Sequence, residues 1–237
     1  MKIFALECSG AQASAAFADG RRVAGEFYLA SGQKHSRTLL PMVEALLKTG
    51  GFSLADADVF AVCAGPGSFT GVRIGVAALK GLADAADKPC FPVSALETAA
   101  YPFADRTAET VCAVMDARCR QVYTARFRAG ERLTPDEALT IDTLGEQLQS
   151  VEGPIRLTGD GAALVFEALS PAFGSRLLCA APAERYPRAA FAALLAEEKL
   201  ARGETPVPAG KLMPVYLRLP QAERELQKKT KQKEQTV

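Results

Sequence analysis

Short apolar runs separated by turn residues open the chain. Residues 3–6 and 13–18 are apolar, and the Asp19-Gly20 pair that follows them is typical of a tight hairpin leading into residues 23–29. Strands joined by such a short turn pair with one another as neighbours. The start of the chain therefore predicts a three-stranded sheet.

The hydrophobic period then becomes helical. Large apolar residues recur at three- and four-residue steps within residues 35–48, and Gly50-Gly51 ends the pattern, which predicts a helix closed by a glycine cap. The pattern that follows predicts a buried strand, a helix after a glycine loop, a strand and a helical turn at residues 59–63, 70–86, 90–94 and 95–101. The first half of the chain is therefore an α/β unit.

The two predicted helices carry more large apolar residues than one face of each can hold. On the first helix, Leu40 and Met42 fall outside the stripe that must cover the sheet. On the second, Phe69 stands at the start and Ile74 lies off the apolar face. Because a soluble monomer seldom leaves such residues clustered in solvent, a partner or a second copy of the chain is expected to cover them.

A similar order of elements restarts about half a chain later. Apolar residues 111–115 end at Asp116, as residues 3–6 end at Glu7, and a strand at 121–128 then reaches a second glycine turn. A helix, a strand, a tight Gly-Asp-Gly turn and a last helix are predicted at residues 142–150, 155–158, 159–161 and 189–201. Two copies of a β-β-β-α-β-α unit are therefore predicted.

The repeat divides the chain into two lobes and a tail. The predicted lobes are residues 1–103 and 104–220, with the seam within residues 101–109. Residues 221–237 are charged and nearly free of large apolar residues, so they have little surface to bury. We expect them to form a mobile tail.

Composition and charge narrow the picture further. The 237 residues are 49% hydrophobic and carry a net charge of +1, so the chain lacks the positive field with which nucleic-acid binders neutralise phosphates. No apolar run reaches the length of about 20 residues that a membrane span requires, and Glu7 interrupts the first run too early for a signal peptide. The six cysteines form no C-x-x-C pair. A cytoplasmic protein with reduced cysteines is expected.

The most informative segment is A-G-P-G-S-F-T-G-V-R-I-G, residues 64–75. Its glycines permit close approach of backbone, and Ser68 or Thr70 is placed to cap the helix that follows, whose N-terminal amides attract anions. The segment lacks the G-K-[ST] ending of a P-loop and the spacing of a dinucleotide fingerprint. A structural turn and an anion site both fit these residues.

Several further motifs carry a resemblance that covers nearly the whole chain. The motifs are L-E-C-S, H-S-R-T-L-L-P, A-L-K-G-L-A, V-S-A-L-E, M-D-A-R, T-G-D-G and P-V-Y-L-R, which begin at Leu6, His35, Ala78, Val93, Met115, Thr158 and Pro214. Together with the glycine segment they resemble the TsaB family, also called YeaZ. The resemblance implies a duplicated actin-like (ASKHA, ribonuclease H-like) two-lobed fold, in agreement with the repeat read from the residues.

The resemblance also implies partners. A TsaB-like chain is expected to be a non-catalytic subunit that binds and activates a TsaD-like catalytic subunit in threonylcarbamoyl transfer to adenosine of tRNA. A P-loop ATPase subunit joins the same assembly, tRNA is held only indirectly, and the chain alone is expected to form a homodimer. The expected interface residues on the first-lobe helices are His35, Arg37, Leu40, Phe69, Arg73 and Ile74.

A remnant of a nucleotide site is the second implication. The candidate residues are Glu7, Ser9, Gly65, Gly67, Ser68, Asp116, Gly159 and Gly161. The usual aspartate of the first turn is Glu7 here, which weakens the expectation that this turn holds a phosphate. No cofactor is expected.

No catalytic or metal-binding residue is expected. TsaD-like proteins carry an H-x-x-x-H pair one helical turn apart, and the corresponding positions here are Ala95 and Ala99. His35 is the single histidine of the chain, so a site with two histidines cannot form.

Three enzymatic alternatives stay open at this stage. A small ATPase or kinase would use the cleft between the lobes directly, and a metallopeptidase would need the missing histidines. A two-metal nuclease would need Glu7, Glu97 and Asp116 to converge. The simpler interpretation of the carboxylates is that Asp116 caps its own turn and Glu7 accepts hydrogen bonds from nearby backbone amides.

Overall fold

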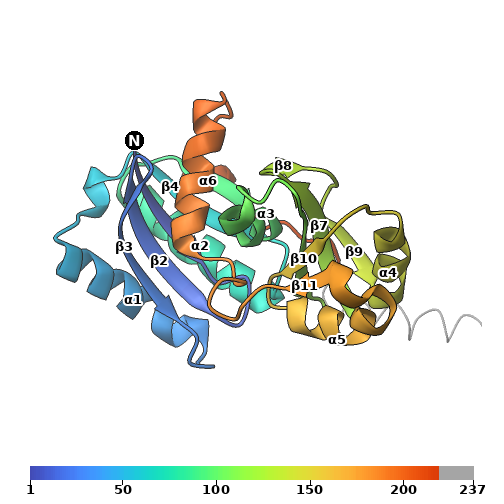
Figure 1. Cartoon of the computed structure of the whole chain (residues 1–237). Coiled ribbons are helices and arrows are strands. Elements are labelled where there is room, and N and C mark those ends of the chain that lie inside the picture. The colour runs from blue at the N-terminus through green and yellow to red at the C-terminus, as the bar shows by residue number, and fades with distance from the viewer. Residues whose placement is uncertain (219–237) are drawn as a thin grey trace, which may run out of the picture.

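The computed structural model describes residues 1–218 (Figure 1). Its first half contains β1 (Lys2–Glu7), β2 (Ala13–Asp19), β3 (Arg22–Leu29), α1 (His35–Gly50), β4 (Val59–Gly65), α2 (Phe69–Ala85), β5 (Cys90–Ser94) and α3 (Ala95–Ala100). The second half contains β6 (Thr110–Asp116), β7 (Gln121–Arg128), β8 (Glu131–Arg132), β9 (Glu137–Thr140), α4 (Ile141–Gln149), β10 (Ile155–Thr158), α5 (Ala162–Phe173), β11 (Leu177–Cys179) and α6 (Ala189–Ala201). The predicted tail, 221–237, lies outside the described residues.

Each half forms one mixed sheet. The first sheet has the strand order β3-β2-β1-β4-β5, in which β1 pairs antiparallel with β2 and parallel with β4. The second has the order β11-β10-β6-β7-β8, in which β6 pairs antiparallel with β7 and parallel with β10, and β9 pairs with β7. The same order of strands in both sheets confirms the predicted duplication and the α/β class.

The helices form three layers around the two sheets (Figure 1). α1 and α2 cover one face of the first sheet, where Phe4 and Leu6 of β1 are buried with them. α4 and α5 cover the far face of the second sheet. α3 and α6 lie between the sheets, in one core that contains Ile3 of the first sheet and Met115 of the second.

In the middle layer, each helix packs on the sheet formed by the other half of the sequence. α6, from the second half, packs on β1, β2 and β4 of the first sheet, whereas α3, from the first half, packs on β6 and β7 of the second. The packing of α6 therefore does not follow the predicted boundary between residues 103 and 104. No helix within residues 1–218 is long and apolar enough to cross a membrane.

The predicted ends of α1 and α2 are confirmed, but one predicted outward residue is not. Gly51 adopts the left-handed conformation at the end of α1, and the Ser68 hydroxyl accepts a hydrogen bond from the Gly71 amide at the start of α2. The prediction that Met42 faces outward is wrong, because Met42 is only 7% exposed. α1 packs against β2, β3 and α2, so more than one stripe of this helix is covered.

Four helices and strands within residues 1–218 were not located in the sequence interpretation, namely β8 and β9 before α4, and α5 and β11 after β10. α5 and β11 follow the Gly-Asp-Gly turn and complete the second unit. α5 is apolar along most of its length and contains Pro171, so it lacks the clear amphipathic period that marks α1.

Candidate functional site: the cavity between the two sheets

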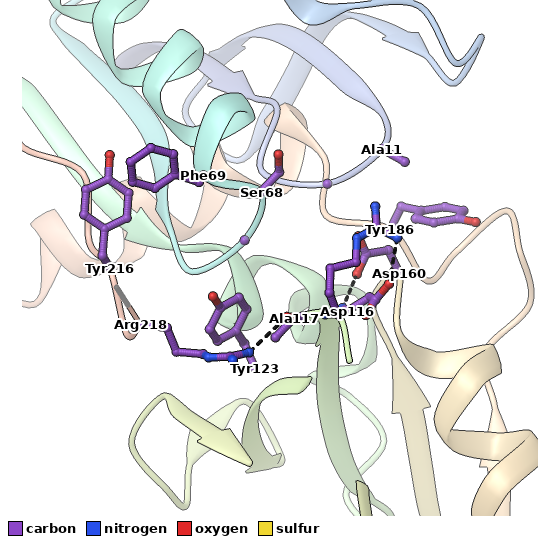
Figure 2. Close-up of a pocket in the computed structure, with 13 residues that line it drawn as sticks. Ala11, Ser68, Phe69, Asp116, Ala117, Tyr123, Asp160, Tyr186, Tyr216 and Arg218 are labelled. Carbon is purple, nitrogen blue, oxygen red and sulfur yellow. Dashed lines mark hydrogen bonds and ion pairs between the residues drawn. The ribbon is translucent and has the colours of Figure 1, made fainter. Parts of the chain in front are cut away.

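A cavity of about 500 Å³ opens between the strand ends of the two sheets (Figure 2). The first half contributes the turn after β1 and the loop before α2, and the second half contributes the turn after β6 and the start of α5. The lining residues are Gly10, Ala11, Gly67, Ser68, Phe69, Asp116, Ala117, Arg118, Tyr123, Asp160, Tyr186, Tyr216 and Arg218. We name this space the inter-sheet cavity.

Two adjacent carboxylates form the acidic wall of the cavity. Asp116, at the end of β6, accepts a hydrogen bond from the Arg118 amide at 2.7 Å and pairs with the Arg118 guanidinium at 3.2 Å. The prediction that Asp116 caps its own turn is thus confirmed. Asp160 accepts a hydrogen bond from the Asp116 amide at 3.0 Å, and burial raises the pKa of Asp160 to about 6. Asp160 was not among the predicted site residues, although the Gly-Asp-Gly turn that contains it was visible in the sequence.

Glu7, the counterpart of Asp116 in the first sheet, is fully buried and does not line the cavity. It accepts hydrogen bonds from the Ser9 amide at 2.6 Å and from the Ser9 hydroxyl, and Gln12 donates to it at 3.3 Å. Burial raises the pKa of Glu7 to about 8. Burial thus disfavours the charged form of Glu7, and its carboxyl group fills the first turn together with Ser9 and Gln12.

The glycine loop contacts other backbone of the same chain. Gly65 has φ +128°, and a Cβ built there would lie 2.3 Å from the Val215 carbonyl oxygen. At Gly67, with φ +156°, a Cβ would lie 2.3 Å from the Ser9 carbonyl oxygen, and the Ser68 amide donates to that same oxygen at 2.7 Å. These contacts explain both glycines by close packing, which favours the structural interpretation of the loop.

The candidate nucleotide residues separate into two groups. Gly67, Ser68 and Asp116 line the cavity, whereas the other five do not. In the second half, the amide of Gly159 donates to the Arg185 carbonyl and that of Gly161 to the Val114 carbonyl. These two amides, which a phosphate would need, are therefore already used within the chain.

An aromatic wall was only partly visible in the sequence. Tyr216 packs against Phe69 with ring centroids 4.9 Å apart, while Tyr123 and Tyr186 stand on other sides of the cavity (Figure 2). Arg218 donates to the Ala117 carbonyl at 2.9 Å across the mouth. Tyr216 is 39% exposed, and it belongs to the P-V-Y-L-R motif that carried the family resemblance.

The residues expected at a partner interface lie on α1 and α2. Leu40 is 56% exposed and Arg37 is also exposed, whereas His35 donates through Nε2 to the Gly10 carbonyl at 2.9 Å. On α2, Arg73 is exposed and its guanidinium lies 4.0 Å above the Phe69 ring. The remaining residue of the set, Ile74, is half-buried against the core of the first sheet.

The positions that correspond to a histidine pair lie inside α3. Ala95 and Ala99 are completely buried in the core between the sheets. Glu97, on the same helix, forms ion pairs with Arg132 at 3.1 Å and Lys199 at 3.2 Å. Within residues 1–218, no group of three or more His, Cys, Asp or Glu side chains is arranged to hold a metal ion, so Glu7, Glu97 and Asp116 do not converge.

A duplicated pair of such sheets, with a cavity where their central strands end, defines the actin-like class of proteins. Two distant structures share this fold: component A of the (R)-2-hydroxyglutaryl-CoA dehydratase of Acidaminococcus fermentans, with a TM-score of 0.53, and the ROK hexokinase of Thermus thermophilus, with a TM-score of 0.51. Each is 14% identical to this chain, and they cover 85% and 84% of it and 99% and 100% of their own chains. At this identity the likeness shows the fold alone.

Nearer relatives identify the family. The family model TsaD, described as tRNA N6-adenosine threonylcarbamoyltransferase, matches residues 29–224. The tRNA threonylcarbamoyladenosine biosynthesis protein TsaB of Bacillus subtilis is 31% identical over 94% of this chain and 96% of its own length, and that of Escherichia coli is 34% identical over 68% and 72%. YeaZ from Pseudomonas aeruginosa is 30% identical, with a TM-score of 0.74 over 91% of this chain and 99% of its own. The chain belongs to the TsaB (YeaZ) family.

Proposed function

We propose that this protein is a non-catalytic subunit that binds a TsaD-type catalytic subunit and activates it for threonylcarbamoyl transfer to adenosine of tRNA. The likeness to TsaB proteins over almost the whole chain carries the proposal. The names of those relatives assign them to threonylcarbamoyladenosine biosynthesis, and the match to the TsaD model links this chain to the catalytic subunit by descent.

The chemistry of the two halves supports a binding role. Methyl groups stand at Ala95 and Ala99, fully buried, where the resemblance to TsaD predicts the two metal-binding histidines. In the first strand-end turn the Ser9 amide and hydroxyl both donate to the buried Glu7, so the Ser9 amide is not available to a phosphate. A kinase of this fold would need both of its turns open to a nucleotide.

The outer face of α1 and α2 is the proposed partner surface. It carries Leu40, which is more exposed than most other large apolar side chains, and the exposed cations Arg37 on α1 and Arg73 on α2. Such an apolar residue with basic residues on the same helices fits a partner helix with apolar and acidic positions. His35, Phe69 and Ile74 border this surface, and the same face serves a homodimer when the chain is alone.

The remaining partners follow from charge and from the assembly. A net charge of +1 gives the chain little attraction for polyanions, so tRNA is held by the catalytic subunit and contacts this chain only indirectly. A P-loop ATPase subunit joins the same complex. These steps take place in the cytoplasm, where tRNA is modified.

A charge-insertion experiment tests the proposal. Wild-type protein mixed with the TsaD-type subunit of the same organism should elute from gel filtration as a complex, with its mass measured by light scattering. Leu40→Glu should raise the dissociation constant of the complex at least about tenfold, because a charge would be buried in an apolar contact.

The matched control is Leu164→Glu, which places the same charge on an exposed leucine of α5, on the far face of the second sheet. This variant should bind like wild type. Absence of any complex with the wild-type chain, or tight ATP binding with turnover by the isolated chain, would contradict the proposal and favour the small ATPase or kinase.

A further inference from the structure

The last described residues cross the outer face of the first half before they reach the second. Val207 pairs with Cys90 at the free edge of β5, and Leu212 is buried in the core under α2. Lys80 of α2 donates to the Gly210 carbonyl at 2.9 Å. We name residues 212–218, which continue from this anchor to the cavity, the strap.

Tyr216 of the strap belongs to two sites at once. Its hydroxyl accepts a hydrogen bond from Arg73 Nε at 2.8 Å, and its ring packs on Phe69, so it is attached to the exposed end of α2. The same ring lines the inter-sheet cavity (Figure 2). Any change in the hydrogen bonding of Arg73 therefore acts on a wall of the cavity.

The strap also joins the two halves of the molecule. The Val215 amide donates to the Ala64 carbonyl at 2.7 Å in the first half, and Arg218 donates to the Ala117 carbonyl in the second. Gly65 permits this path, because any Cβ there would collide with the Val215 carbonyl oxygen. Leu212 anchors the start of the strap in the core, but Met213 is 66% exposed and Val215 47% exposed, so little apolar burial holds the rest of it.

We propose that the strap couples partner binding on α2 to the inter-sheet cavity, an inference that rests on the proposed function. A carboxylate of the partner that pairs with Arg73 through Nε and the neighbouring Nη takes the donor that Tyr216 uses, and it replaces the neutral hydroxyl because an arginine-carboxylate pair is the stronger hydrogen bond. Tyr216 then leaves Phe69, and the Arg218 contact at the cavity mouth opens. The complex and the free chain thus differ in the width of the cavity.

This coupling is reciprocal. Suppose that a molecule fills the cavity and contacts Tyr216 or Arg218. The factor by which this molecule changes the chain's affinity for the partner equals the factor by which the partner changes the chain's affinity for this molecule. The strap is the element with two states. It takes one position when Arg73 donates to the Tyr216 hydroxyl and the other when Arg73 pairs with a carboxylate of the partner.

Hydrogen exchange of the isolated chain tests the attachment. Arg73→Ala removes the donor to Tyr216, so the strap peptide with the Val215 amide should exchange about three- to tenfold faster than in wild type. Arg37→Ala, which removes an exposed arginine of α1, is the control and should leave the strap unchanged. Equal strap exchange in wild type and Arg73→Ala would overturn the proposal.

A fluorine reporter tests the coupling in the complex. Labelling with 3-fluorotyrosine keeps the hydroxyl and gives five ¹⁹F resonances, and that of Tyr216 is identified by its loss in Tyr216→Phe. Addition of the unlabelled TsaD-type subunit should shift this resonance toward its position in Arg73→Ala, whereas the resonance of Tyr101, in the layer between the sheets, should keep its position.

The outcomes separate this inference from the proposed function. A complex seen by gel filtration with an unchanged resonance at position 216 overturns the coupling and leaves the proposed function intact. Failure of the labelled and the wild-type chains to form any complex overturns both.

Discussion

The carboxyl groups that end β1 and β6 occupy equivalent places in the duplicated fold, yet their environments are opposite. The first, Glu7, is buried with Ser9, and burial raises the pKa of its carboxyl to about 8. The second, Asp116, lines the cavity and pairs with the Arg118 guanidinium, which is 82% exposed. Repetition of the backbone therefore did not preserve the chemistry of the turn.

The difference comes from what packs on each turn. The loop with Gly67 lies directly on the Ser9 carbonyl, and Gln12 fills the space between Glu7 and the Pro187 carbonyl. No comparable loop covers Arg118, which has a positive φ of 65°. The carboxyl group at the end of β1 is part of the core, while its counterpart at the end of β6 forms part of the cavity wall.

The largest effect is expected where the first turn is sealed. Gly67→Ala should lower the free energy of unfolding by about 4 kcal/mol or more, because its Cβ would collide with backbone that cannot move aside and the φ of +156° disfavours any side chain. Gly81→Ala, in the middle of α2 with open space around it, should be neutral or slightly stabilising. Urea denaturation measures the free energy of unfolding of both variants. If Gly67→Ala is as stable as wild type, the loop at Gly67 does not pack tightly on the Ser9 carbonyl.

The protonation state of Glu7 gives the next largest effect. Its pKa is about 8 in the folded protein and about 4.5 in a free chain, so the folded state holds its proton more tightly. Stability from this group is complete below pH 4.5 and is lost as the pH rises through 8. Glu7→Gln, which stays neutral, should therefore be more stable than wild type at pH 8.5, by on the order of 3 kcal/mol.

Melting curves from pH 4.5 to pH 8.5 measure this effect. The gap between Glu7→Gln and wild type should widen steadily over that range. The comparison variant is Glu44→Gln, at an exposed position of α1, and its curve should run parallel to that of wild type. A constant gap would mean that Glu7 is already ionised at neutral pH.

The smallest effect is expected in the second turn. Asp116→Asn keeps an acceptor for the Arg118 amide but removes the ion pair with the solvated Arg118 guanidinium. The free energy of unfolding should therefore change by less than about 1 kcal/mol. The same variant alters a wall of the cavity, which makes it a useful contrast with Glu7→Gln. If Asp116→Asn lowers the free energy of unfolding as much as Gly67→Ala is expected to, the turn after β6 is as tightly packed as the turn after β1.

Much of the fold was predictable because its signals are local. Alternation and turn pairs located β1 to β3, a helical period located α1, and Ser68 was one of two candidate caps for α2. Met42 was misplaced because side-by-side packing of α1 on α2 is a tertiary effect. The duplication of the strand ends also suggested where the carboxylates lie.

The site was less predictable, because it is assembled from distant segments. Asp160 and Tyr186 reach the cavity from loops of the second half, and the strap brings Tyr216 and Arg218 across the first. No periodic pattern encodes such contacts. The glycines of residues 64–75 were visible as a motif, but only the structure shows that Gly65 and Gly67 accommodate backbone rather than leaving space for a ligand.

Reconstitution of tRNA modification tests the central claim most directly. The transfer of label to tRNA from a threonylcarbamoyl donor labelled in its threonine group is measured with the TsaD-type subunit and the P-loop ATPase subunit, with and without this chain. We predict incorporation when wild-type chain or Leu164→Glu is added, little when it is omitted or replaced by Leu40→Glu, and none when this chain is present without the TsaD-type subunit. Full incorporation without this chain, or incorporation by this chain without the TsaD-type subunit, would contradict its role as a non-catalytic activator.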